Sequence, residues 1–463
     1  MRGWFITLWF ACMAPAAAQA TDLILTNAKV FTGDPARPLA EAIAIDRGRI
    51  QAVGSAREIA ELAKPGVRVI DAGGRLVTPG LVEAHGHVGA DPPGEEAQMP
   101  NLPWPGPTPE QALAAVRQRA QTGSGWITGV IGPLVATDAR DWRAALDEAA
   151  PGRPVMLRPW WGHTTLINST GLQALGLRDD VRDPLGGWYG RRANGQLDGR
   201  LRETAEWSAL RRATAGLSLS ASAAAYRAAA DRYAAWGVTS YHHMANDQPL
   251  SIVLAALTEA DVPLKWTVYA WALPKEAPAE AWREFRGAKA GPNTRVGGLK
   301  WVLDATPIER DARMRQAYTD RPGWSGRSNY SDVQVREILR MALSEPQQLA
   351  LHVVGDGEMA RLLTLMEAAA PAEVWRTRRV RIEHGDGLAR DLVRRAARLG
   401  VVVVQNPLHM DRMPDESGVP MMTVRLGPER TEDFQLMKSS RCWPRACPLR
   451  SVRTRAARPP IRS

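Results

Sequence analysis

Between residues 79 and 437, short apolar runs alternate with longer segments rich in Ala and Arg. We expect seven of the apolar runs to be buried strands, at 81–84, 237–241, 264–270, 298–303, 349–354, 380–383 and 401–404. Helices are expected between some of these strands, at 220–236, 358–370 and 388–399. Strands that alternate with helices over such a length indicate parallel pairing, most simply an α/β fold of the (β/α)₈ barrel type. An eighth strand is missing from the pattern.

Two further regions flank or interrupt this barrel pattern. Residues 21–78 contain β-branched runs at 23–25, 42–45, 49–53 and 67–70, separated by turns, which predict a small antiparallel β unit. Residues 90–225 form a long insertion after the first barrel strand and are rich in Trp, Pro and Gly. Because insertions at the carboxyl ends of barrel strands usually cover the active site, we expect this one to do so.

Residues 1–20 have the pattern of a secretory signal peptide. Arg2 is followed by an almost wholly apolar run from Trp4 to Ala14, and residues 18–20 form an A-x-A cleavage site. We therefore expect a mature protein that starts near Thr21 and is secreted or periplasmic in a bacterium. The alternative is a buried first helix. No later stretch approaches 18 apolar residues, so no membrane association is expected after cleavage.

Charge and cysteine are both concentrated outside the body of the chain. Residues 438–463 hold eight basic residues and no acid, so the net charge of +10 falls to +2 without them. A nearly neutral body gives no support for a nucleic-acid partner. The three cysteines are Cys12, Cys442 and Cys447, which excludes a disulfide framework, a cysteine zinc site and a thiol nucleophile in the body.

Histidines end three of the predicted barrel strands. His85 and His87 form H-x-H, and alternate residues of a strand point to the same face, so both rings can bind one ion. His352 ends the strand at 349–351, and His384 ends the run at 380–383. One histidine at a strand end is more often structural, but four at equivalent ends predict a divalent metal site. Neutral imidazole suits zinc and similar ions.

Lys300 lies inside the predicted strand at 298–303. A lysine in an apolar strand is costly unless it is paired or modified. Burial lowers a lysine pKa, and a neutral amine can take up CO₂ as a carbamate that bridges two metal ions. A salt bridge to a neighbour such as Asp304 explains the pattern equally well, so both interpretations stay open.

Several strings resemble one known family. The segment 77–87, V-T-P-G-L-V-E-A-H-G-H, resembles the opening of the amidohydrolase superfamily, specifically amidohydrolase family 3. Other similar strings are N-S and A-L-G-L (168–169 and 174–177), D-P-L-G-G (183–187), N-G-Q-L-D-G with Glu203 (194–199), G-V-T-S (237–240), Lys300 with Asp304, H-V-V-G-D (352–356) and R-I-E-H (381–384). The resemblance implies a metal-dependent hydrolase with a barrel at 79–437 and a small composite β-sandwich domain. It implies attack on a non-peptide C–N bond by a metal-activated water.

The same resemblance implies roles for individual residues. The metal ligands would be His85, His87, His352 and His384, with Lys300 as a carboxylated bridge, and the catalytic residues would be Lys300, His352 and His384. His163, Trp161 and Asn168 of the insertion are candidates for substrate binding, although packing or loop hydrogen bonding explains them at least equally well. The expected partners are a small amide-type substrate and one or two divalent ions, Zn²⁺ by preference. An oligomer stays open.

The family pattern ends in an eighth strand with G-S-D, whose Asp binds the metal and acts as general acid and base. Here residues 441–454 contain Arg, Pro, Cys and Trp without acids or periodicity. Permitted codons for 441–454, read from the third base, give L-L-A-A-G-V-P-L-A-L-G-S-D. We therefore interpret 438–463 as an out-of-frame tail, with a genuine basic tail as the alternative.

The loss of this Asp bears on function. Positioned acid–base groups contribute ~10²–10⁴-fold in rate, so the chain as written is expected to be poorly active or inactive. A catalytically inactive metal- or ligand-binding relic of an amidohydrolase is the competing interpretation. A nucleic-acid binder that uses the basic tail is disfavoured, because the body lacks a basic patch with interleaved aromatic residues.

Overall fold

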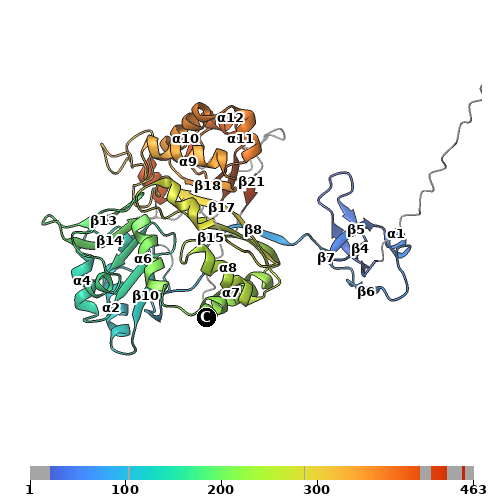
Figure 1. The fold of residues 1–463 in the computed structure, drawn as a ribbon, viewed down its shortest axis with the longest axis horizontal. Coiled ribbons are helices and arrows are strands. Elements are labelled where there is room, and N and C mark those ends of the chain that lie inside the picture. Colours follow the sequence, from blue (N-terminus) through green and yellow to red (C-terminus); the bar gives the residue numbers. More distant parts are fainter. Residues whose placement is uncertain (1–20, 103–104, 286, 407–418, 435–450, 454–463) are drawn as a thin grey trace, which may run out of the picture. The chain divides into compact units, whose positions relative to one another are not determined.

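The computed structural model describes residues 21–102, 105–285, 287–406, 419–434 and 451–453. The predicted signal peptide lies outside these residues. The chain divides into two compact units, Met1–Leu81 and Val82–Ser463 (Figure 1). Within the described residues, no helix has both the length and the apolar character needed to cross a membrane.

The first unit contains two small sheets, of order β5-β4-β1-β6 and β3-β2-β7. Their strands are β1 (Leu23–Thr26), β2 (Lys29–Phe31), β3 (Leu39–Ala40), β4 (Ala42–Asp46), β5 (Arg49–Gly54), β6 (Arg68–Asp71) and β7 (Leu76–Val77). The pairs β1–β4, β4–β5 and β2–β3 are antiparallel, as predicted, whereas β1–β6 and β2–β7 are parallel, which the prediction of an antiparallel unit missed. The chain returns to pair in parallel after the short helix α1 (Ala56–Ala60), whose Ile59 packs on Ile24 in the core.

The main sheet of the second unit has the order β21-β20-β19-β18-β17-β16-β15-β8. Seven of its strands are β8 (Leu81–Gly86), β15 (Val238–Ala245), β16 (Lys265–Trp271), β17 (Thr294–Val302), β18 (Gln348–Val353), β19 (Arg381–His384) and β20 (Val402–Gln405). Neighbours from β15 to β21 pair in parallel and form a nearly closed barrel sheet. All seven predicted strands are therefore present, and the α/β barrel prediction is confirmed.

Helices alternate with these strands, as the sequence pattern predicts. They include α7 (Leu219–Ala235), α8 (Leu250–Ala260), α9 (Asp332–Ser344), α10 (Asp356–Ala369), α11 (Ala372–Arg378) and α12 (Arg390–Arg398). The largest core cluster joins strand residues such as Val268, Leu351 and Ile382 to helix residues such as Leu254 and Leu362. Strands buried on both faces need near-continuous apolar runs, which is why they are visible in the sequence.

The eighth position of the main sheet is held by three residues of the tail. β21 (Ser451–Arg453) pairs in parallel with β20, with Ser451 opposite Val403 and Arg453 opposite Gln405. The sequence pattern lacked an eighth strand, whereas in the structure three residues take its position. They can do so because main-chain pairing needs no particular side chains. These three residues carry no carboxylate, and the sequence has no acid after Asp433.

The insertion forms a second sheet, of order β13-β14-β12-β11-β10-β9. Its strands are β9 (Gly94–Glu96), β10 (Trp126–Ile131), β11 (Val155–Pro159), β12 (Thr164–Ile167), β13 (Gly187–Arg191) and β14 (Leu197–Glu203). The helices α2 (Pro109–Ala120) and α4 (Trp142–Ala149) contribute apolar residues to its core, among them Val116, Trp142 and Leu146. The sequence patterns indicated an insertion but not this sheet.

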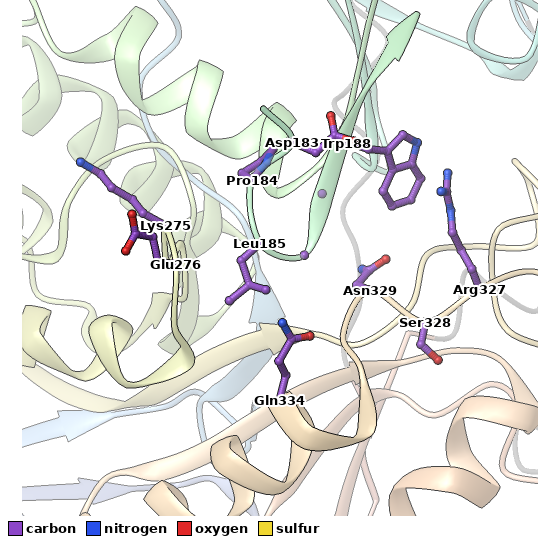
Figure 2. Close-up of a pocket in the computed structure, with 12 residues that line it drawn as sticks. Asp183, Pro184, Leu185, Trp188, Lys275, Glu276, Arg327, Ser328, Asn329 and Gln334 are labelled. Atoms are coloured by element: carbon purple, nitrogen blue, oxygen red, sulfur yellow. The ribbon is translucent and has the colours of Figure 1, made fainter. Parts of the chain in front are cut away.

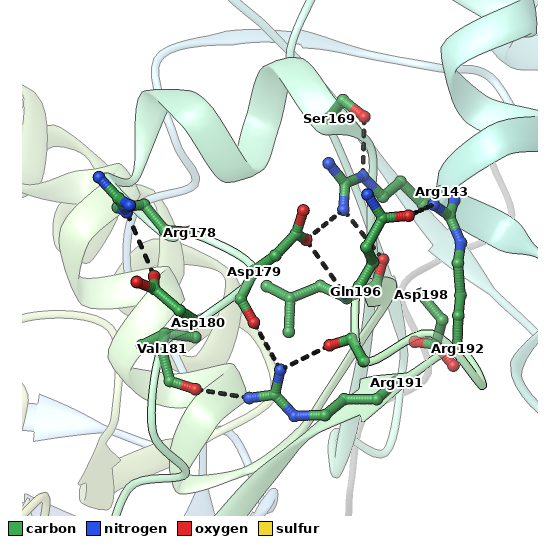
Figure 3. Close-up of polar contacts among 12 residues, drawn as sticks. Arg143, Ser169, Arg178, Asp179, Asp180, Val181, Arg191, Arg192, Gln196 and Asp198 are labelled. Carbon is green, nitrogen blue, oxygen red and sulfur yellow. Dashed lines mark hydrogen bonds and ion pairs between the residues drawn. The ribbon is translucent and has the colours of Figure 1, made fainter.

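Two arginines fasten the segment between α5 (Ser169–Ala174) and β13 (Figure 3). The Arg143 guanidinium donates to Oδ1 of Asp179 at 2.7 Å and to the carbonyl oxygen of Leu197 at 3.0 Å. Arg191 donates to the carbonyl oxygens of Asp179 and Gly195, at 2.6 and 3.1 Å. The segment that these two arginines hold continues into the 183–188 loop, which lines a pocket of the second unit.

Candidate active site

The four strand-end histidines come together at the carboxyl ends of the barrel strands. The ring centres of His85 and His87 are 5.3 Å apart, those of His85 and His384 are 4.8 Å apart, and those of His352 and His384 are 4.5 Å apart. Residues contributed by β8, β18 and β19 thus form one continuous group of rings, although up to 299 positions separate them in the chain.

The spacing of these rings is close to that of imidazoles around a common ion. A Zn–N bond of ~2.1 Å plus ~1.1 Å within the ring places each ring centre ~3.2 Å from the ion, so two ligands should be ~4.5–5.2 Å apart. The side chains would still need to turn. Across the described residues, no group of three or more His, Cys, Asp or Glu side chains is already arranged to hold an ion.

A buried ion pair supports His85. Nδ1 of His85 lies 2.5 Å from Oε2 of Glu383, and Arg381 donates to both oxygens of Glu383, at 2.7 and 3.1 Å. All three side chains are buried. Burial would raise the pKa of Glu383, but Arg381 and His85 hold this pKa well below its ordinary value. Glu383 therefore stays ionised and leaves Nε2 of His85 as the nitrogen available to a ligand.

His384 has a comparable arrangement. Its Nδ1 lies 2.9 Å from the side-chain oxygen of Asn406, which follows β20. His384 has a φ of 69°, in the left-handed region that non-glycine residues rarely adopt. Backbone strain of this kind is concentrated at functional sites. Sequence reasoning missed the roles of Glu383 and Asn406, although Glu383 stands inside the R-I-E-H string.

Lys300 is completely buried in β17, and its Nζ has no hydrogen-bond partner in the described part of the chain. Nζ lies 5.2 Å from the ring centre of Trp271, and burial lowers the Lys300 pKa to about 7. Asp304 instead accepts hydrogen bonds from the backbone N–H groups of Val354, Gly355 and Arg313. The salt bridge from Lys300 to Asp304 is therefore not formed.

His163 reaches the ring cluster from the insertion. Its ring centre is 4.7 Å from that of His352, and its Nδ1 lies 2.9 Å from Oε1 of Glu203. Burial alone would lower the pKa of His163, but the neighbouring Glu203 carboxylate outweighs burial and raises this pKa to about 9. Of the three residues predicted to bind substrate, His163 thus contacts a candidate metal ligand, His352.

The contacts of Asn168 and Trp161 agree with the alternative that these residues serve packing or loop hydrogen bonding rather than substrate binding. Asn168 is fully buried at the start of α5, where its side-chain oxygen accepts from the N–H groups of Gly171 and Val155. Its amide group donates to the carbonyl of Arg153 at 2.8 Å. Trp161 donates its indole N–H to Glu309. Both side chains are therefore engaged in hydrogen bonds within the protein.

Two pockets lie in the second unit. One, of about 420 Å³, is lined by His87, Arg158, Asp247 and the 88–91 loop. The other, of about 510 Å³, is lined by the 183–188 loop, Lys275, Arg327 and Asn329 (Figure 2). Figure 2 shows Trp188 beside Arg327, whose guanidinium carbon is 3.1 Å from the centre of the indole ring. Both volumes suit a small molecule.

A family model described as the amidohydrolase family matches residues 68–442. This chain belongs to the amidohydrolase family. The family is one of metal-dependent hydrolases, and the barrel and the strand-end histidines agree with that membership. The predicted family is therefore confirmed.

Individual relatives and solved structures resemble most or part of this chain. The putative amidohydrolase YtcJ of Bacillus subtilis is 25% identical over 87% of this chain and 74% of its own length. The N-substituted formamide deformylase of Arthrobacter pascens is 29% identical, but over only 40% of this chain and 35% of its own length. An uncharacterized metal-dependent hydrolase from Pyrococcus furiosus has a TM-score of 0.60 at 21% identity, with 89% and 81% of the chains covered. The structural likeness shows the fold alone.

Proposed function

We propose that this amidohydrolase cleaves a non-peptide amide C–N bond in a small molecule, at a divalent metal site formed by the strand-end histidines. The observation that carries the proposal is the convergence of His85, His352 and His384 from three barrel strands, with His87 next to them. A named relative acts on N-substituted formamides, which supports an amide-type substrate.

The donor set fits a zinc-like ion. His85, His87, His352 and His384 would hold it, and Nε2 of His352 is buried without a hydrogen-bond partner in the described chain. The buried amine of Lys300 would join them as a carbamate, formed when the neutral amine adds to CO₂ and loses a proton. A divalent ion bound here supplies an ionised water at neutral pH and polarises a carbonyl.

The chain's own residues orient these donors. Glu383 fixes the ring of His85, and Asn406 fixes that of His384. The 420 Å³ pocket, which His87 lines, is the proposed place for the substrate. Arg158 in its wall forms two long ion pairs, at 3.8 Å to Glu206 and 3.9 Å to Asp91.

We further propose that the chain as written turns over slowly, because Ser451–Arg453 occupy the eighth strand position without a carboxylate. The same observation favours the second candidate, a metal- or ligand-binding relic that has lost catalysis. Neither a nucleic acid nor a membrane is proposed as a partner. Export is proposed from residues 1–20, with N-terminal sequencing of the exported protein expected to begin at Thr21.

One experiment separates the two candidates. The protein is loaded with Zn²⁺, its metal content is measured, and formamides, N-acyl compounds and cyclic amides are screened for hydrolysis. A second protein carries L-L-A-A-G-V-P-L-A-L-G-S-D at 441–453. Metal in both proteins and hydrolysis by the second supports the amidohydrolase. Metal in both without hydrolysis by either supports the relic, and absence of metal from both refutes the site.

A further inference from the structure

A chain of hydrogen bonds leads from the 510 Å³ pocket to the ring cluster. The side-chain amide of Asn329, which lines the pocket in Figure 2, donates to Oε2 of Glu203 at 3.0 Å. The other oxygen of Glu203 lies 2.9 Å from Nδ1 of His163. The ring of His163 in turn contacts that of His352.

The backbone is strained at both ends of the His163–Glu203 bond. The φ angle is 71° at His163 and 55° at Glu203, where β14 passes into α6 (Thr204–Thr214). Both side chains are buried, with Glu203 fully so. A positive φ is uncommon for any residue other than glycine, and such strain persists where the surrounding structure fixes a functional geometry.

Further contacts hold the two residues from outside. Asn329 also donates to the carbonyl oxygen of Val302 at 3.0 Å, which anchors it to the end of β17. The indole of Trp207, on α6, packs edge-on against the His163 ring with 5.8 Å between centres. The ring of His163 is therefore held by the Glu203 carboxylate at Nδ1 and by the contact with Trp207.

We propose that Glu203 and Asn329 are positioning residues that hold His163 so that its Nε2 hydrogen-bonds the reacting carbonyl oxygen of the substrate. With Nδ1 bonded to Glu203, only Nε2 of this ring can face a ligand. A fixed donor in a buried site stabilises the negative charge that develops on that oxygen far better than one in water. The inference rests on the proposed hydrolase function and adds the residues that would recognise the carbonyl.

A double-mutant cycle tests this on the full chain loaded with Zn²⁺. The probe is a phosphonamidate, whose tetrahedral phosphorus resembles a hydrated amide, and its affinity is measured by calorimetry. His163→Gln should weaken binding about 100-fold, as the loss of one oxyanion donor does in other enzymes. Glu203→Gln should weaken binding about tenfold alone and have no further effect in the His163→Gln background, because it acts through His163.

A matched control and a spectroscopic readout distinguish positioning from general damage. Glu358→Gln removes another buried carboxylate, held by Arg361 and Ser328, and its effect should be the same with and without His163. In histidine ¹⁵N spectra, Glu203→Gln should change the Nδ1 signal that disappears in His163→Gln, whereas Glu358→Gln should not. Asn329→Ala, at the pocket wall, serves if the Glu203 variant does not fold, and its effect should also vanish in the His163→Gln background.

The outcomes are distinct. If Glu203→Gln weakens phosphonamidate binding equally in the wild-type and His163→Gln backgrounds, Glu203 does not position His163. Failure of wild-type protein that holds Zn²⁺ to bind the phosphonamidate overturns the hydrolase proposal, and this inference with it. If the wild-type protein binds the phosphonamidate tightly but the effects of Glu203→Gln and His163→Gln simply add, this inference is overturned and the hydrolase proposal stands.

Discussion

Glu383 on β19 lies 2.5 Å from Nδ1 of His85 on β8, although 298 residues separate the two in the chain. In the sheet order, β18, β17, β16 and β15 lie between these strands. The bond therefore crosses the inside of the barrel. It joins the first histidine of the H-x-H pair to the strand that carries His384, and Arg381 extends it to the carbonyl of Ala84 on β8.

Glu383→Gln should damage both stability and metal binding. Arg381 would be left as a buried charge without its ionic partner, which costs about 3–5 kcal/mol of unfolding free energy. Loss of the bond to His85 should weaken Zn²⁺ affinity ~10–100-fold. Urea unfolding and metal titration measure the two effects. Glu373→Gln, which breaks an exposed ion pair with Arg376, should change stability by about 1 kcal/mol or less.

His352→Asn should remove bound metal without unfolding the barrel. The ring of His352 lies at the centre of the cluster, in contact with His384 and His163. Metal content after dialysis should fall by at least half relative to wild type. The control is His243→Gln: His243 is equally buried, but Nε2 of this residue contacts the Tyr226 hydroxyl at 3.2 Å on the helix side of the sheet. Loss of metal from the control alone would contradict the proposed site.

Glu206 should make the protein less stable as the pH rises. Neither oxygen of this buried carboxylate accepts a hydrogen bond within the described residues, and burial raises the Glu206 pKa to about 7. The folded state then binds a proton more tightly than the unfolded state, where the pKa is 4.5, so stability falls between about pH 4.5 and pH 7. Glu206→Gln should therefore stabilise the protein at pH 8, by up to about 3 kcal/mol, and hardly at pH 4. A constant difference across thermal unfolding curves at these pH values would refute this.

Restoring the G-S-D string at 451–453 should raise turnover by at least ~10²-fold over the chain as written, because it returns a positioned carboxylate. The matched control has the same restored segment with Asn in place of its Asp. Zn²⁺ content should be compared in all three proteins, and hydrolysis should follow only the carboxylate. Equal turnover from all three would contradict the out-of-frame interpretation.

The sequence predicted the barrel well because its strands are buried on both faces and read as continuous apolar runs, as at 349–354. It failed for the insertion, where strands such as β9 and β12 have only three or four residues and follow Gly- and Pro-rich turns. The convergence of the four histidines was predictable because each follows or ends an apolar run in the sequence. Glu383 and Glu203 were not, because their importance depends on partners that are distant along the chain. Likewise, the sequence could not show whether Lys300 forms a salt bridge with Asp304, because the answer depends on the backbone groups that Asp304 contacts in the structure.

The pairing of Ser451–Arg453 with β20 has a practical consequence. Strands associate through main-chain amides that every residue except proline carries, so we expect that another segment can take the place of Ser451–Arg453 beside β20. We therefore expect complementation to work: a protein that ends near residue 437, mixed with a synthetic peptide ending in L-A-L-G-S-D, would separate the proposed metal-binding body from the proposed acid–base group. Turnover would then be controlled by peptide dose.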